Sequence, residues 1–173
     1  MQPQIINKVD SLSVSDYYQN LTNFVEFKMK FKGRSINEWQ QILTFPFIKE
    51  DGLSEEELLK LNKKSIELFE IIYQNASIAK SHFTASKAAL EKALNVQKEK
   101  IRNDINASKA KMLSVENLQS KAMLMCEKES QAVVMAEIFY DFWEYYIQNI
   151  KLYNTRITSL NITKHHEIKN SNY

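Results

Sequence analysis

A basic segment contains the residues of this chain whose types and spacing could do chemistry. Residues 76–104 read "ASIAKSHFTASKAALEKALNVQKEKIRND", with a lysine or arginine every few positions and small residues between many of them. Cations on a helix can bind the phosphates of a polyanion without sequence preference, and small neighbours let a backbone approach closely. The alternative is an ordinary solvated helix surface. Both interpretations stay open on the residues alone.

The charge distribution favours a localised basic region. The formal net charge of the chain is only +2. From Lys80 to Lys128, however, ten basic residues stand against five acidic ones, whereas between Lys49 and Glu70 seven acids stand against four lysines. Such an asymmetry points to a surface for an anionic partner. The candidate contacts are seven cations: Lys80, Lys87, Lys98, Lys100, Arg102, Lys109 and Lys111.

Several kinds of catalytic and metal site are excluded or disfavoured. The only glycines, Gly33 and Gly52, are isolated, so a glycine-rich phosphate loop is excluded. Cys126 is the single cysteine, which excludes an internal disulfide and a CxxC site, and we interpret it as a small buried residue. We expect no enzymatic activity and no cofactor.

Three carboxylates of the aromatic segment lie at spacings of four and three residues. Glu137, Asp141 and Glu144 share a helical face and could bind a divalent cation. The interpretation that we favour is a solvated or ion-paired face, because charged side chains at this spacing usually pair with basic neighbours. The adjacent His165 and His166 fit an ordinary polar tail. We therefore expect no bound metal.

Two long helices must position the basic segment. Ser54 and Glu57 form a capping box, and an apolar stripe follows from Leu58 to Leu90, with no helix breaker until about Ser108. A bend is expected near Leu113, with Ser114 as a new cap. The second stripe runs from Met135 to Leu160 in steps of three and four residues.

These patterns predict an all-α protein, built as an elongated helical hairpin that oligomerises through its C-terminal helix. We expect an N-terminal extension at 1–53, a hairpin domain at 54–162 and a polar, frayed tail at 163–173. Within the extension, Ser35 and Glu38 form another capping box, and the helix that follows should end by Pro46. Residues 25–31, "VEFKMKF", alternate like a strand but lack a convincing partner strand.

The aromatic residues of the second stripe allow three interpretations. Exposed rings can stack on the bases of single-stranded nucleic acid. Rings at helical spacing are more often core. We favour a third arrangement, in which one face closes the hairpin while a second face, with Tyr140 and Trp143, meets another subunit. The candidate oligomerisation residues are Phe139, Trp143, Tyr146, Ile150 and Ile157.

The order of these segments resembles that of UvsY-type recombination mediators of T-even-like phages. The resemblance covers about residues 65–162: "IAKSHFTASKAALEKAL", then "VQKEKIRND", then "IFYDFWEYYIQNIKLYNTRITSLNI". It implies a ring-like oligomer that binds single-stranded DNA and loads a RecA-like recombinase onto DNA coated by a single-strand binding protein. Lys87, Lys98, Lys100 and Arg102 then fall at the expected DNA contacts. This chain departs from the family in lacking a glycine after the basic helix and in its added N-terminal residues.

Two further expectations concern location and rival functions. The start "MQPQIINKVD" lacks a signal-peptide pattern, and the most apolar stretch carries acidic residues, so we expect a cytoplasmic protein that does not bind membranes, in a host cell if it is viral. The main rival to DNA binding is a virion or scaffolding protein that uses the hairpin for subunit contacts alone.

Overall fold

The computed structural model describes residues 14–49 and 53–171. The chain divides into two compact units, Met1–Thr44 and Phe45–Tyr173. Residues 45–49 therefore belong with the helical hairpin, and the division falls before the boundary expected at residue 53.

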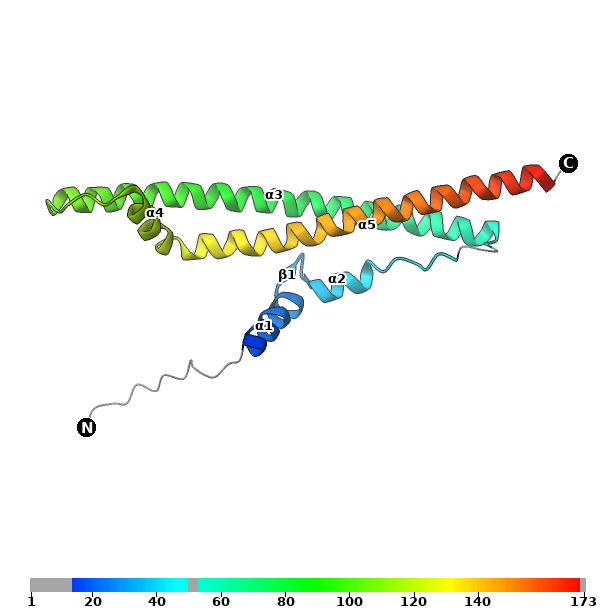
Figure 1. Cartoon of the computed structure of the whole chain (residues 1–173), viewed down its shortest axis with the longest axis horizontal. Helices are drawn as coiled ribbons and strands as arrows, with labels where there is room; N and C mark the ends of the chain where they lie inside the picture. Colours follow the sequence, from blue (N-terminus) through cyan, green and yellow to red (C-terminus); the bar gives the residue numbers. More distant parts are fainter. Residues whose placement is uncertain (1–13, 50–52, 172–173) are drawn as a thin grey trace, which may run out of the picture. The chain divides into compact units, whose positions relative to one another are not determined.

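The second unit is a helical hairpin, as the sequence predicts. Helix α3 spans Glu55–Ala107, a short helix α4 spans Val115–Leu124, and helix α5 spans Glu127–Ser171. Figure 1 shows α3 and α5 side by side and antiparallel, with α4 where the chain turns back between them. The all-α class and the two long packed helices are thus confirmed.

Local sequence signals explain where these helices begin. The Ser54 hydroxyl accepts a hydrogen bond from the Glu57 amide, while the Glu57 carboxylate accepts one from the Ser54 amide at 2.9 Å. This capping box satisfies backbone donors that the first helical turn leaves open. Ser114 caps α4 by accepting from the Asn117 amide at 3.3 Å. Helix α3 ends at Ala107, followed by Lys109 with a positive φ of 53°.

The hydrophobic core of the hairpin is the seam, the row of contacts between α3 and α5. On α3, the residues from Leu58 to Ala79 that recur in steps of three and four are buried. On α5, Trp143, Ile150 and Ile157 are buried at seven-residue intervals. This repeat keeps one row of side chains facing the partner helix, as in a coiled coil. Between Ala79 and Ile101, by contrast, the α3 side chains in the seam are only half-buried.

Polar pairs fix the alignment of the two helices. Asn62 and Asn161 exchange two amide hydrogen bonds, of 3.3 and 3.2 Å, and the Ser65 hydroxyl donates to the Asn154 side-chain oxygen. Each pair is satisfied only when these residues lie opposite each other, because a buried amide without a partner is costly. A shift of one helical turn along the seam would break both pairs.

Two further sets of apolar contacts close the hairpin. Near the start of α3, Ile48 joins a buried cluster with Leu58, Leu61 and Ile157, and the ring of Phe45 lies 5.1 Å from that of Tyr153. Near the end of α3, a second cluster contains Ile101 with two residues of α4, Leu118 and Ala122. Residues outside the two long helices therefore cover each end of the seam.

The first unit contains α1 (Val14–Asn23), a π-helical segment η1 (Phe24–Lys28), strands β1 (Lys30–Phe31) and β2 (Arg34–Ser35), and α2 (Ile36–Ile42). The strands pair antiparallel across Lys32 and Gly33, which both have positive φ, as a tight primed hairpin requires. Of the strand-like alternation at 25–31, for which the sequence offers no convincing partner strand, only Lys30–Phe31 forms a strand, and its partner is β2. The predicted capping box of Ser35 and Glu38 opens α2, which ends before Pro46.

The polar tail expected at 163–173 differs from the structure, in which α5 continues to Ser171. No glycine or proline interrupts this segment, and Lys164 forms an i,i+3 ion pair with Glu167 at 3.2 Å. Such pairs favour the helix by a few tenths of a kcal/mol each. Polarity alone therefore did not mark the end of the helix. Residues 172–173 lie outside the described part of the chain.

Because only one side of α5 faces the seam, substitutions at nearby positions of this helix should differ sharply in their effect on the free energy of unfolding. Ile150 is fully buried, whereas Leu152 is 71% exposed. Ile150→Ala should lower the free energy of unfolding by about 2–5 kcal/mol, because it leaves a cavity in the seam. Leu152→Ala, the matched control, should change it by less than about 0.5 kcal/mol. Urea denaturation followed by circular dichroism measures both free energies of unfolding, and equal effects would contradict the burial of Ile150 in the seam.

Candidate nucleic-acid interface

The structure brings four of the seven candidate cations onto one side of α3. Lys80 and Lys87 are seven residues apart, Lys98 follows eleven residues later, and Arg102 four residues after that. Because an α-helix has about 3.6 residues per turn, these intervals are close to whole turns. We call Lys80, Lys87, Lys98 and Arg102 the basic face.

The other three candidates lie elsewhere. Lys100 is two residues from Lys98, which places it on the opposite flank of α3. Lys109 and Lys111 are exposed in the connection between α3 and α4. They lie beyond the end of the helix that carries the basic face. The sequence predicted one basic segment, and the structure divides it into a face, an isolated lysine and a loop pair.

The basic face is accessible and its charges are available. Lys80, Lys87 and Arg102 are exposed, and Lys98 is half-buried. Within residues 14–49 and 53–171, the ion pairs of the chain lie elsewhere, among them Lys60–Glu56, Lys64–Glu67 and Lys164–Glu167. Cations that are not already paired inside the protein can bind an external anion without first giving up a partner.

An aromatic pair lies beside the basic face, where α3 meets α5. The Phe83 ring of α3 stacks on the Tyr140 ring of α5, with centroids 5.4 Å apart and planes at 15°. The Lys87 ammonium lies over the Phe83 ring, 5.1 Å from its centroid. A cation over a ring face is attracted by the ring's quadrupole, which holds Lys87 at this position. Both rings are half-buried, so an edge of the pair reaches the surface.

Acidic residues border this region and limit it. Glu91 lies between Lys87 and Lys98 on the same side of α3. On α5, the negative charge of Glu144 raises the pKa of the Tyr140 hydroxyl, and partial burial and a hydrogen bond to Glu144 raise it further. The phenol therefore stays protonated and donates its hydrogen bond. An anionic strand should follow the α3 side of the aromatic pair, away from Glu144, and it would pass Glu91, which lowers the net charge on that side of α3 from +4 to +3.

The carboxylates of α5 are not arranged as a metal site. In the described part of the chain, no group of three histidine, cysteine, aspartate or glutamate side chains could hold a metal ion. Glu137 and Asp141 are exposed and Glu144 faces Tyr140. Cys126 is buried, as expected for a small apolar residue. None of the described helices has the length and apolar character needed to cross a bilayer.

The candidate oligomerisation residues of α5 lie inside the hairpin. Trp143, Ile150, Ile157 and Phe139 are buried within a single chain, and Tyr146 is half-buried beside Phe45. The expectation that Trp143 belongs to a second, exposed face is wrong, because it lies on the same seven-residue row as Ile150 and Ile157 and is 0% exposed. The seven-residue repeat of Trp143, Ile150 and Ile157, and not the grouping of the aromatic residues, decides which side of α5 packs against α3.

Sequence reasoning missed the role of Phe83 and Tyr140 at this site. The sequence pattern places Phe83 in the apolar stripe and Tyr140 at a subunit contact, and it connects neither with the basic residues. The spacing of Phe83 and Lys87, four residues apart on one helix, is a usable signal for a cation over a ring. The stacking across the two helices is not readable from the sequence, since it depends on their alignment.

Comparison of the chain with protein-family models, with curated proteins and with solved structures finds no match.

The geometry around Tyr140 predicts a specific titration behaviour. Glu144→Gln removes the main cause of the raised pKa, so the pKa of Tyr140 should move down towards that of an ordinary tyrosine. Glu137→Gln, an equal charge change on the same helix, should leave it unchanged, because Glu137 does not contribute to the shift. NMR of ring-labelled tyrosine follows this titration, and a shift in the second variant instead would contradict the assigned contact.

Proposed function

We propose that this protein binds single-stranded DNA along the basic face and acts as a non-enzymatic recombination mediator. The observation that supports DNA binding is the alignment of Lys80, Lys87, Lys98 and Arg102 on one accessible side of α3, outside the ion pairs of the described chain. Neutralised phosphates release counterions, which gives binding without sequence preference. This chemistry matches a protein that must act on any DNA sequence.

The size of the basic face suits a short stretch of nucleic acid. Lys80 and Arg102 are 22 residues apart, which at about 1.5 Å per residue is roughly 33 Å along the helix. Phosphates along one stacked DNA strand are spaced by about 3.4 Å, so roughly ten nucleotides span this distance. Four cations over that length give weak binding for one chain. Several chains on one strand would bind it much more firmly.

The Phe83–Tyr140 pair favours single strands over duplex. An unstacked base can place its face against the exposed edge of the pair in an edge-to-face contact, while the bases of a duplex are already stacked on each other. Lys87 lies at the same place and can contact the adjoining phosphate. In this arrangement one nucleotide would place its base against the Phe83–Tyr140 pair and its phosphate against the Lys87 ammonium.

The mediator role rests on the resemblance to UvsY-type proteins in residues 65–162. It implies that the chain assembles on single-stranded DNA and loads a RecA-like recombinase where a single-strand binding protein is already present. The second candidate function, a structural or scaffolding protein, is supported by the apolar side chains exposed on α3, among them Leu59 and Ile66. Such side chains suit subunit contacts.

A salt titration with two matched variants tests the DNA proposal. The first replaces the four residues of the basic face by alanine. It should weaken binding to a fluorescent oligothymidylate and flatten the slope of log K against log salt by about 0.7 for each phosphate that the variant no longer neutralises. The control variant removes the same charge away from this face, by alanine at Lys60, Lys64, Lys151 and Lys169.

The control variant should keep the wild-type slope to within about 0.7, because its lysines lie outside the basic face. Equal slopes for both variants would show that only overall charge matters and would contradict the assigned face. A wild-type protein that does not bind the oligonucleotide even at low salt would refute DNA binding and favour the structural function.

A further inference from the structure

A row of apolar side chains on α3 lies outside the seam. Leu59, Ile66 and Tyr73 follow each other at seven-residue intervals, with Asn62 and Phe69 between them. Leu59 is 69% exposed and Ile66 is 61% exposed, and Phe69 stacks on Tyr73 at 4.2 Å. Steps of three and four residues are the pattern that helices use to pack against a further helix. We call Leu59, Ile66, Phe69 and Tyr73 the outer stripe.

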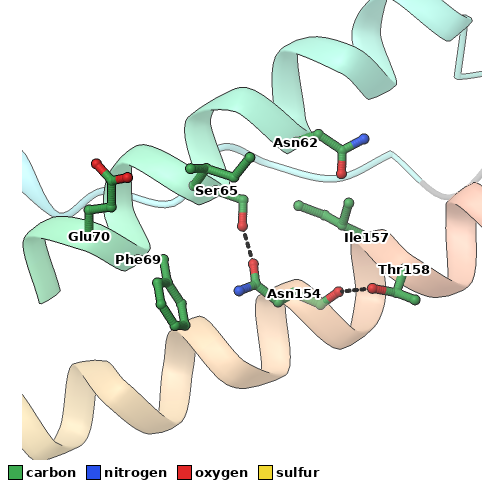
Figure 2. A pocket seen from close by; sticks show the side chains of 8 residues that line it. Asn62, Ser65, Phe69, Glu70, Asn154, Ile157 and Thr158 are labelled. Atoms are coloured by element: carbon green, nitrogen blue, oxygen red, sulfur yellow. Dashed lines mark hydrogen bonds between the residues drawn. The ribbon is translucent and has the colours of Figure 1, made fainter. Parts of the chain in front are cut away.

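The outer stripe borders an open groove of about 420 Å³ between α3 and α5. Figure 2 shows Asn62 and Phe69 from α3 together with Asn154 and Thr158 from α5 around this groove. On the other flank of the seam, Phe45 and Ile48 of the same chain pack against α5. The hairpin unit thus covers one flank of the seam with its own residues, and the described residues of that unit leave the groove flank uncovered.

Charges beside the outer stripe indicate what would cover it. Lys63 and Glu70 are exposed, of opposite sign, and seven residues apart along the edge of the stripe. If a second α3 packs antiparallel, with Ile66 at the two-fold axis beside the partner's Ile66 and Leu59 beside the partner's Tyr73, then Lys63 lies within one residue of the level of the partner's Glu70. The two-fold axis repeats this contact, so two ion pairs form. A parallel partner would instead place Lys63 level with the partner's Lys63.

We propose that the outer stripe is a self-association surface, on which a second copy of this chain packs antiparallel through Leu59–Tyr73 to form a two-fold dimer. Lys63 and Glu70 carry opposite charges on either side of Ile66, so a second copy of this chain can pair with both. This charge pattern is the reason to propose another copy as the partner that covers the outer stripe. The contact does not use the basic face and leaves it accessible on both chains. This inference goes beyond the proposed DNA binding and does not depend on it.

Charge reversal at the two edge positions tests the pairing directly. Lys63→Glu and Glu70→Lys should each weaken the dimer about tenfold, since each replaces two attractive contacts by two repulsive ones. The double variant, K63E/E70K, should restore the wild-type dimer because the pair is re-formed with its signs exchanged. Sedimentation velocity at low salt measures the dissociation constants. Both side chains are exposed, so all three variants should fold.

The apolar centre provides a second, independent measurement. Ile66→Ser should give monomers at concentrations where the wild-type protein is dimeric, because it removes the layer at the two-fold axis. Leu152→Ser changes an exposed apolar residue of α5 in the same way; it is the matched control and should leave the dimer intact. Circular dichroism confirms that both variants are folded.

Three outcomes would overturn the proposal. The first is a wild-type protein that stays monomeric at about 100 µM, a concentration well above the dissociation constant of a weak specific dimer. The outer stripe would then be covered by something other than a second copy of this chain. The second is a dimer that Ile66→Ser does not weaken. The third is a double charge variant no tighter than the single ones, since only the antiparallel pairing predicts that rescue.

Discussion

The structure depends on the burial of one row of side chains between two antiparallel helices. A helix as long as α3 has a surface too large for a partner to cover, and a single pair of helices can bury only one stripe on each. The seven-residue spacing of Trp143, Ile150 and Ile157 selects that stripe on α5. Everything that lies off this row, including the basic face and the outer stripe, is left at the surface for other contacts.

The apolar row does not by itself fix how the helices align, because similar side chains recur along it. The amide exchange between Asn62 and Asn161 and the contact of Ser65 with Asn154 provide that information. The buried side-chain oxygen of Asn75, by comparison, has no hydrogen-bond partner in the described chain. Polar groups in a seam lower its stability and increase its specificity. The alignment that they select also sets Phe83 against Tyr140.

The sequence predicted the helices well and the surfaces less well. Capping boxes at Ser35 and Ser54 depend only on nearby residues, and both begin a helix where expected. The assignment of Trp143 to an outer face failed because six aromatic residues within eight positions hide the heptad that decides burial. The stacking of Phe83 on Tyr140 joins residues far apart in the chain, so no local pattern predicts it.

The seam is buried to different degrees along its length, and this affects how the hairpin opens. It is tightly packed from Leu58 to Ala79, and the α4 cluster around Ile101 closes its far end, but between these points the α3 side chains that face α5 are only half-buried. Stretches with less buried apolar surface separate at a smaller free-energy cost than the whole molecule needs to unfold. We therefore expect the stretch that carries Lys80, Lys87 and Lys98 to separate from α5 at a smaller free-energy cost than either end of the hairpin.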